Sequence, residues 1–407
     1  MYFRPLFTIL ASVSCLAAWA QQEVTATYPV NGNVEREQYR SHVTLESVAD
    51  NGSVVYAYGS VYLNLTGVKM NKTAGTGTYT DREDRGTNSA LLATDGSHVT
   101  AYKCEVRLHA DRSYGIAATG EGTEVKVNEG KTTMSKQQSS AFHSTGGALI
   151  DIDKFEISSF SKMSPLLSTG QGGRIEAVNL TGGTSGIAAP LFSCRGDIHV
   201  SESRLESKSA PVGHVKGSGT ISLDKCEFIQ VSSCGFYISE GNGTAGRIVM
   251  NGCKVNLKDG PLLLVDDGCV TVELKKNTLS STEDGLISIK GGKVSLTAEN
   301  QKLKGDIVAD SVCSVTLNLG KGAMLGGAVN GTGNRDADVT VSIGKGAIWY
   351  PWADSHVSAI SFQQGVENGA KQIKGKSDVY YDASNPANSY LEGREYRLGG
   401  QGMLIPE

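Results

Sequence analysis

The stretch Ile221-Ser-Leu-Asp-Lys-Cys-Glu-Phe228, with Phe236-Tyr-Ile-Ser-Glu-Gly241 shortly after it, decides the fold. Apolar and polar residues alternate in both segments, a pattern typical of β-strands that turn one face inward. A glycine ends the second segment, and glycine adopts turn conformations that a Cβ atom disfavours. Two strands and a turn therefore form a unit of about 24 residues.

The same unit recurs through most of the chain. Each copy has a short apolar strand, a turn glycine and a second strand, and successive glycines are 21 to 27 residues apart. The glycines are Gly96, Gly120, Gly146, Gly170, Gly196, Gly217, Gly241, Gly268 and Gly291. The second strands begin at Val99, Val125, Ile150, Ile175, Ile198, Ile221, Ile248, Val270 and Val294.

The length of the unit predicts its architecture. A propeller blade needs roughly 40 to 45 residues, and a leucine-rich repeat needs a Leu/Asn signature that is missing here. One turn of a parallel β-helix fits, because stacked turns bury apolar columns that no single turn can bury alone. We predict an all-β, right-handed parallel β-helix over residues 51–348, with about 24 residues per turn.

The segments outside the repeats have different compositions. Residues 1–20 combine Arg4, an apolar run and Ala18-Trp19-Ala20, which predicts a signal peptide and hence a secreted or cell-surface protein. A buried helix and a lipoprotein acylated at Cys15 are the alternatives. Residues 21–50 are interpreted as an N-terminal lead-in or cap, residues 73–89 as a polar loop that projects from the body, and residues 349–407 as an aromatic-rich C-terminal cap.

A set of segments carries a resemblance: 303–310, the strands at 315–323 and 339–347, and 380–382, 390–393 and 396–398. They resemble exported bacterial right-handed parallel β-helix proteins, a group that includes pectin-lyase-like folds and adhesin-like autotransporter passenger domains. The resemblance implies the fold far more than an activity, and no membrane barrel is expected to follow Glu407. The resemblance covers roughly residues 50–400.

One outward column of side chains is the best candidate for chemistry. Residues one position beyond each second-strand start should stack, which places Lys126, Asp151, Glu176 and His199 in successive turns. Two adjacent carboxylates could form an acid/base pair or bind Ca²⁺, and the sequence suggests no other cofactor. The alternative is a solvated ladder of mixed charges, and a one-residue error in register would dissolve the column.

Two further patterns leave alternatives open. Cys226 and Cys253 fall at the same offset in consecutive turns, which is compatible with a disulfide or with a column of buried thiols. Arg195-Gly196-Asp197 forms a tripeptide at a turn, where a ligand role for a partner receptor competes with chance occurrence in a Gly-rich chain.

Composition limits the partners. The net charge of −4 and its even distribution predict no nucleic-acid binding, and no apolar run after residue 20 is long enough for a transmembrane helix. The first hypothesis is an exported non-enzymatic protein that binds glycans or cell surfaces in an adhesive or structural role. The second is a polysaccharide lyase or hydrolase that uses Asp151 and Glu176, with Lys126 and His199 beside them.

Overall fold

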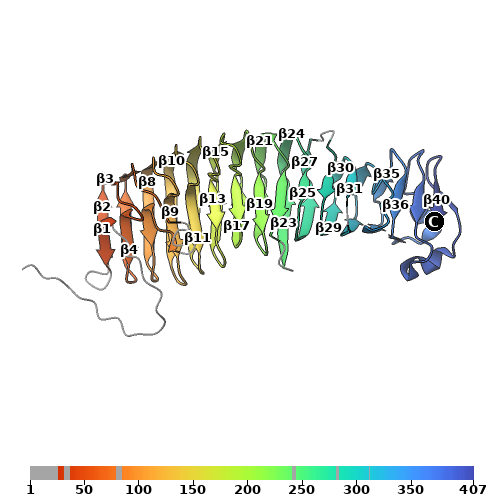
Figure 1. Ribbon diagram of the computed structural model, residues 1–407, viewed down its shortest axis with the longest axis horizontal. Helices are drawn as coiled ribbons and strands as arrows, with labels where there is room; N and C mark the ends of the chain where they lie inside the picture. Colours follow the sequence, from red (N-terminus) through yellow and green to blue (C-terminus); the bar gives the residue numbers. More distant parts are fainter. Residues whose placement is uncertain (1–25, 32–36, 79–84, 241–243, 281–283, 311) are drawn as a thin grey trace, which may run out of the picture.

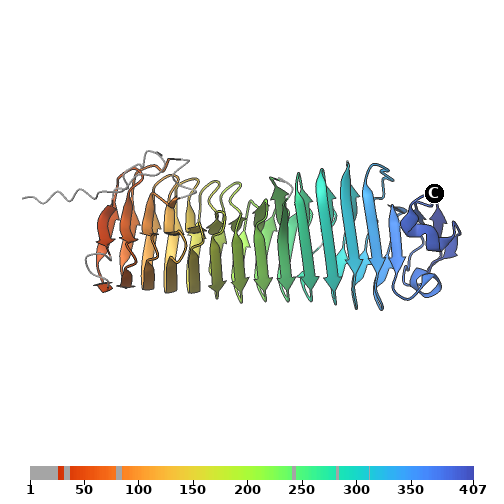
Figure 2. The same ribbon diagram turned by 90° about the horizontal axis from the view of Figure 1, so that it is seen from below.

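The chain is a parallel β-solenoid of roughly 14 turns, with strand partners about 25 residues apart. This computed structural model describes residues 26–31, 37–78, 85–240, 244–280, 284–310 and 312–407. Figures 1 and 2 show the turns stacked in chain order along one long axis. The all-β parallel solenoid predicted from the repeat is confirmed, whereas the signal peptide at 1–20 and the turn at Gly241 lie outside the described ranges.

Sheet 1 is formed by the strand that opens each turn. Its strands pair in parallel in the order of the chain. They are β1 (Ala26–Asn31), β4 (Ser53–Tyr58), β7 (Ser89–Ala93), β9 (Tyr114–Thr119), β11 (Ser140–Thr145), β13 (Leu167–Thr169), β16 (Phe192–Cys194), β19 (Gly213–Lys216), β22 (Phe236–Ser239), β25 (Leu263–Val265), β28 (Ile287–Ile289) and β31 (Ile307–Ala309).

Sheet 2 is formed by the second strand of each turn, which comes directly after the corner that ends the sheet 1 strand. Its strands are β2 (Glu37–Ser41), β5 (Tyr62–Thr66), β8 (His98–Leu108), β10 (Glu124–Met134), β12 (Leu149–Ser159), β14 (Arg174–Val178), β17 (Asp197–Ser201), β20 (Thr220–Asp224), β23 (Ala245–Asn251), β26 (Cys269–Lys275), β29 (Gly292–Glu299), β32 (Cys313–Leu319), β34 (Asp338–Ile343) and β37 (Ala359–Phe362).

Sheet 3 closes the triangular turn. The long strands β8, β10 and β12 bend across the corner and belong to both sheet 2 and sheet 3. The remaining strands of sheet 3 are β3 (Thr44–Ser47), β6 (Lys69–Lys72), β15 (Thr181–Thr184), β18 (Arg204–Ser207), β21 (Glu227–Ser232), β24 (Lys254–Asp259) and β27 (Thr278–Leu279).

The C-terminal end departs from the regular turn. A helix, α2 (Val366–Ala370), and a 3₁₀ helix, η1 (Pro386–Leu391), interrupt the strands. Strand β39 (Tyr396–Arg397) runs antiparallel to β40 (Met403–Pro406) at the edge of the last sheet. The other strands here are β30 (Lys302–Lys304), β33 (Met324–Gly326), β35 (Ile348–Tyr350), β36 (Ser355–Val357) and β38 (Val379–Tyr381).

The N-terminal segment forms a turn of its own. Strands β1, β2 and β3 pair in parallel with β4, β5 and β6 of the next turn. The described part of the predicted lead-in is therefore the first layer of the solenoid. The described ends of the 73–89 loop lie against the body, because Thr87, Asn88 and Ser89 are buried and Thr78 N donates to Asn51 Oδ1 (2.8 Å).

Apolar columns from the three sheets form one continuous core along the axis. In sheet 2, one inward column stands in register, and each of its residues is 2 % exposed or less: Val99, Val125, Ile150, Ile175, Ile198, Ile221 and Ile248. After Ile248 the predicted alignment is wrong by two residues, since Ile248 pairs with Val272 and not with Val270. A shift of two keeps the same face inward, so the alternation of apolar residues does not reveal it.

The corner between sheets 2 and 3 is built from left-handed residues. At this position in eleven successive turns φ lies between 47° and 64°, and only two of the residues are glycine. The other nine are all polar residues with a Cβ atom, although a left-handed conformation costs such residues roughly 1 kcal/mol or more. The residues are His42, Gly67, Lys103, Glu129, Lys154, Asn179, Glu202, Lys225, Gly252, Lys276 and Asn300.

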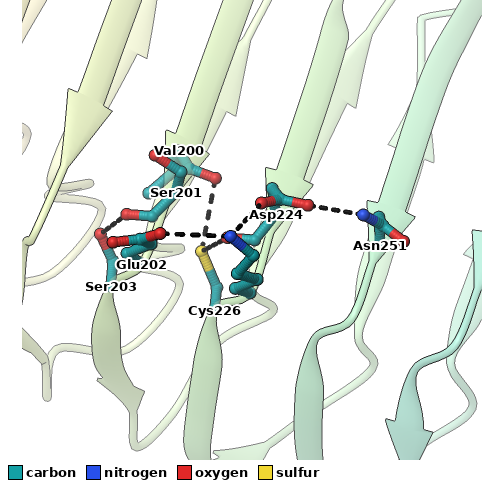
Figure 3. Close-up of polar contacts among 8 residues, drawn as sticks. Val200, Ser201, Glu202, Ser203, Asp224, Cys226 and Asn251 are labelled. Carbon is teal, nitrogen blue, oxygen red and sulfur yellow. Dashed lines mark hydrogen bonds and ion pairs between the residues drawn. The ribbon is translucent and has the colours of Figure 1, made fainter.

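Contacts along this corner link successive turns (Figure 3). Lys225 Nζ lies 3.3 Å from Glu202 Oε1, and Asn251 Nδ2 donates to Asp224 Oδ1 (2.6 Å). Turn glycines lie at the corner between sheets 1 and 2, as predicted. Gly96, Gly120, Gly146, Gly217 and Gly268 have positive φ there, whereas Gly170, Gly196 and Gly291 do not. The sequence thus places glycine at one corner and polar residues at the next.

The residue after the left-handed corner points into the core, and its column becomes polar toward the C-terminus. Cys226 and Cys253 are buried there as free thiols, and their mutual contact together with burial raises the pKa of Cys226. In the turn after Cys253, Asn277 Nδ2 donates to Gln301 Oε1 (3.0 Å) and to Met250 O (3.0 Å). Buried thiols, and not a disulfide, therefore occupy the predicted cysteine column.

Candidate functional site

The predicted outward column is present in the structure. Lys126 on β10 pairs with Asp151 on β12, Asp151 with Glu176 on β14, and Glu176 with His199 on β17. All four lie on the outer face of sheet 2, where strand spacing brings neighbours within about 5 Å. Aligning the internal repeats of the chain therefore gives the correct register for these four residues.

The electrostatics of the column are mild. Burial raises the pKa of Asp151, the neighbouring carboxylate Glu176 raises it further, and Lys126 opposes both effects. Arg174 forms an ion pair with Glu176, and Lys126 Nζ lies 3.0 Å from Glu124 Oε1. Both pairs are solvent-exposed, and such pairs contribute roughly 0 to 1 kcal/mol. The column resembles a charge ladder more than an enclosed site.

The predicted calcium site has few ligands. Ca²⁺ takes about six to eight oxygen atoms, and Asp151 and Glu176 supply at most four. Within the described ranges, no group of three or more His, Cys, Asp or Glu side chains is placed to hold a metal ion. These two carboxylates alone do not make the coordination shell that a calcium site needs.

The Arg195-Gly196-Asp197 tripeptide spans the corner between sheets 1 and 2. Arg195 follows β16, and its Nη2 lies 2.6 Å from Glu240 Oε2. Gly196 N donates to Thr169 Oγ1 (3.1 Å), and Asp197 begins β17 with an exposed side chain. The arginine and aspartate therefore belong to different sheets, and the arginine contributes to a hollow that the sequence does not indicate.

That hollow lies on the outer face of sheet 1, and we call it the sheet 1 hollow. Its volume is about 160 Å³. Its floor carries His143 from β11 and Ser168 from β13, which are register partners in adjacent turns. The full lining is Tyr114, Gln138, Ser140, His143, Met163, Pro165, Ser168, Thr169, Gly170, Ser193, Arg195 and Lys216.

His143 and Ser168 form the most constrained polar contact of this hollow. His143 Nδ1 lies 2.8 Å from Ser168 Oγ, and the two residues are 3 % and 9 % exposed. The imidazole stacks on Tyr114, with ring centroids 4.3 Å apart and an interplanar angle of 10°. Ser168 Oγ also lies 3.1 Å from Ser140 Oγ. Ring stacking and hydrogen bonding thus fix the orientation of His143.

Two cations form one wall of the sheet 1 hollow. Arg195 and Lys216 are neighbours, because the residues before them, Cys194 and Val215, are paired across β16 and β19. Glu240 bridges them, with Oε2 at 2.6 Å from Arg195 Nη2 and Oε1 at 3.8 Å from Lys216 Nζ. The wall carries two positive charges and one negative charge.

His214 extends the same outward row one turn beyond Ser193. Its Nε2 lies 2.7 Å from Ser239 Oγ. Burial, together with the positive charges of Lys216 and Arg195, lowers the pKa of His214 to about 4. The imidazole is therefore neutral at pH 7, and protonating it in the folded protein is unfavourable.

This shift predicts an acid sensitivity. Between the folded pKa of about 4 and the usual value of 6.5, the unfolded chain binds the additional proton, so stability is complete above pH 6.5 and falls as the pH falls toward 4. We expect His214→Gln to show a weaker loss of stability than the parent between pH 6.5 and 4.5 in urea titrations. Equal pH dependence of the two proteins would contradict this assignment.

A second hollow, the sheet 3 hollow, has a volume of about 320 Å³. Its floor includes Gly182 and Gly183 of β15, where the absence of side chains opens the face of the sheet. Charged groups surround it: Arg204 Nε lies 3.2 Å from Glu227 Oε2, and Lys208 Nζ lies 3.4 Å from Glu206 Oε2. The hollow is polar, and its ionic groups are already paired.

Three exposed apolar residues lie on the connections beside the two hollows, and we call them the apolar ridge. It consists of Phe160, Met163 and Ile187, which are 65 %, 53 % and 64 % exposed. These residues lie on the connections from sheet 3 to sheet 1 in successive turns, and Met163 N donates to Ile187 O (3.0 Å). Phe160 lines the sheet 3 hollow and Met163 lines the sheet 1 hollow. Exposed apolar clusters of this kind mark interaction sites.

The sequence interpretation missed the ridge and both hollows. Connections between sheets carry no periodic signal, so Phe160 and Ile187 look like ordinary loop residues. His143 and Ser168 are 25 residues apart, and each is unremarkable alone. Aligning the strands that precede each turn glycine would have placed them in one column.

Comparisons add no narrower identity. No protein-family model matches this chain, and no curated protein or solved structure matches it. In the part of the chain that the structure describes, no helix is long and apolar enough to span a bilayer. The interpretation of the site therefore depends on its own geometry.

Proposed function

We propose that this protein binds glycans outside the cell, in an adhesive or surface-structural role, through the apolar ridge and the two hollows beside it. The observation that carries the proposal is the exposure of Phe160, Met163 and Ile187 beside two polar hollows. Export is part of the proposal and depends on the signal peptide predicted at residues 1–20.

A sugar chain matches this arrangement chemically. A pyranose ring has an apolar C–H face and a rim of hydroxyl groups, so it can pack on Phe160 while its hydroxyls reach polar side chains. Glu206, Lys208 and Arg204 stand around one hollow, and Arg195 and Lys216 stand beside the other. Binding sites typically combine an apolar surface with a few placed polar groups.

The solenoid supplies a rigid and repetitive support. Turns recur at about 4.8 Å, so equivalent side chains recur along the axis at a constant interval. An extended polymer can therefore contact several turns at once, and each contact adds to the affinity. Solenoids commonly use such extended surfaces for binding.

The enzymatic alternative has one observation in its favour, the raised pKa of Asp151 beside Glu176. These carboxylates lie on the outer face of sheet 2, and the two hollows beside the ridge are lined by other residues. A lyase or hydrolase must hold its substrate against its acid and base. Loss of polysaccharide cleavage in Asp151→Asn would support this alternative.

Phe160→Ala is expected to weaken glycan binding at least tenfold, because it removes an exposed aromatic surface; tenfold corresponds to about 1.4 kcal/mol. A glycan array identifies ligands for the parent protein, and calorimetry then compares the variants. Tyr39→Ala is the matched control, since Tyr39 on β2 is 63 % exposed and lies at the N-terminal end. Equal losses in both variants, or no glycan binding by the parent protein, would refute the proposal.

A further inference from the structure

We propose that His143 and Ser168 form a catalytic pair that hydrolyses acyl esters, such as O-acyl groups on a sugar, in the sheet 1 hollow. This activity goes beyond glycan binding and does not depend on it. The observation behind it is a serine hydroxyl, an imidazole nitrogen and two cations that line one small hollow.

The geometry meets the first requirement for a nucleophile and its base. A hydroxyl becomes an effective nucleophile when a base accepts its proton at hydrogen-bond distance, about 2.6 to 3.2 Å. His143 Nδ1 lies 2.8 Å from Ser168 Oγ. In the tautomer with a proton on Nε2, Nδ1 accepts the hydrogen bond from Ser168 and can take its proton.

The second requirement is that the base keeps its orientation. His143 is 3 % exposed and lies flat against Tyr114, so its ring has little freedom to turn. The Ser168 hydroxyl can also donate to Ser140 Oγ (3.1 Å) or Phe142 O (3.2 Å), so its one proton turns among these acceptors and the closer His143 Nδ1 while its oxygen stays in place. These contacts position the pair before any substrate binds, which removes part of the entropic cost of reaching the reactive geometry.

The third requirement is stabilisation of negative charge. When an ester carbonyl is attacked, its oxygen becomes an oxyanion, and positive groups lower the energy of that intermediate. Arg195 and Lys216 line the same hollow as Ser168. Glu240 bridges these cations from the other side and leaves the wall with a net positive charge.

The chemical steps balance with water as the only co-reactant. Ser168 Oγ attacks the acyl carbon while its proton passes to His143 Nδ1. The ester C–O bond then breaks, and the leaving alcohol receives that proton. Water, deprotonated by His143, attacks the acyl-serine; its hydroxyl forms the carboxylic acid, and Ser168 regains a proton. No oxidation occurs in this sequence.

The apolar ridge fits this role as well. Met163 and Pro165 line the hollow together with Ser168. A short acyl chain can therefore pack on Met163 while its carbonyl points toward the cations. We infer short-chain acyl esters as the substrate class, because a hollow of about 160 Å³ has room for little more than an acyl group and part of its alcohol.

The test uses the full chain with p-nitrophenyl acetate and a fluorophosphonate probe. We expect hydrolysis above the uncatalysed rate and probe attachment at Ser168, located by mass spectrometry of peptides. Ser168→Ala should abolish both, and His143→Gln should lower the rate at least 100-fold, the usual range for general-base catalysis. The matched control is Ser288→Ala, an equivalent outward serine of sheet 1 on β28 that lies outside the hollow.

A second readout separates catalysis from structural damage. Ser168→Cys retains a nucleophile beside His143, so it should react with iodoacetamide faster than the seven thiols of the described ranges, of which all but Cys269 are buried. Circular dichroism checks that each variant is folded. Absence of probe labelling at Ser168 in the folded parent protein, or equal hydrolysis by parent and Ser168→Ala, would overturn the proposal. Either result leaves the glycan-binding experiment with Phe160→Ala unaffected.

Discussion

Replacing Asn277 with leucine is expected to lower the free energy of unfolding by about 3 kcal/mol or more. The Asn277 amide lies in the core, where Nδ2 donates to Met250 O and Gln301 Oε1, and Oδ1 accepts from Cys253 N (2.8 Å). Leucine has a similar size, but it removes the acceptor of Cys253 N and the donor to Met250 O in the core, whereas Gln301 Oε1 keeps its bond from the backbone N of residue 277 (2.8 Å). Each buried group left unpaired costs roughly 1 to 3 kcal/mol.

The control for Asn277 is a neighbouring asparagine with the opposite exposure. Asn251, in the turn before it, is exposed and donates to Asp224 Oδ1. Asn251→Leu should change the free energy of unfolding by less than about 1 kcal/mol, since water replaces the lost bond. Urea titrations followed by circular dichroism give both values. Similar losses of unfolding free energy in the two variants would show that the buried hydrogen bonds of Asn277 stabilise the fold no more than the exposed bond of Asn251.

The second large effect concerns Lys72, a lysine with a fully buried side chain on β6. Its Nζ donates to Ala49 O (2.5 Å), and burial lowers its pKa to about 8, an effect that the charge of Asp50 partly offsets. Between pH 8 and the usual value of 10.5 the unfolded chain binds more protons than the folded chain. Stability from this group therefore rises with pH across that interval.

Comparison with Lys72→Met isolates this contribution. The parent protein should gain about 2 kcal/mol relative to the variant between pH 8 and 10, because this interval covers most of the gap between the folded and the unfolded pKa of Lys72. The measurement is the urea midpoint of both proteins at pH 7.5, 8.5 and 9.5. A constant difference across this range would mean that Lys72 keeps its ordinary pKa in the folded state.

The fold can be predicted from the sequence because it consists of one strand–turn–strand unit that recurs along the chain. Inward residues such as Val125 and Ile150, together with glycines such as Gly120 and Gly146, fix the strands, the turn and the repeat length. The same pattern places Asp151 beside Glu176. It does not predict the left-handed corner, because Lys103 or Glu202 at that position resembles any exposed residue of a strand. The two-residue slip after Ile248 is hidden for a related reason, since both alignments bury the same face.

The hollows are harder to predict than the sheets. They arise where connections of different composition meet, so their shape depends on how Phe160, Met163 and Ile187 pack over turns that are 25 residues apart. The chemistry of His143 and Ser168 depends on a contact between turns, and neither residue has a local motif. A register map would have brought the pair together, but the depth of the hollow depends on packing that periodicity does not encode.

The antiparallel strand β39 has a consequence for assembly. A stack of parallel strands ends in an edge of free backbone groups, which can template the addition of strands from other molecules into a filament. Here the edge of the last sheet is a strand of only two residues, and its direction opposes that of β40. A strand of a second molecule that approached in the parallel orientation of the stack would meet a short strand whose backbone N–H and C=O groups are spaced for antiparallel pairing. The addition of a parallel strand from another molecule at this edge is thereby disfavoured.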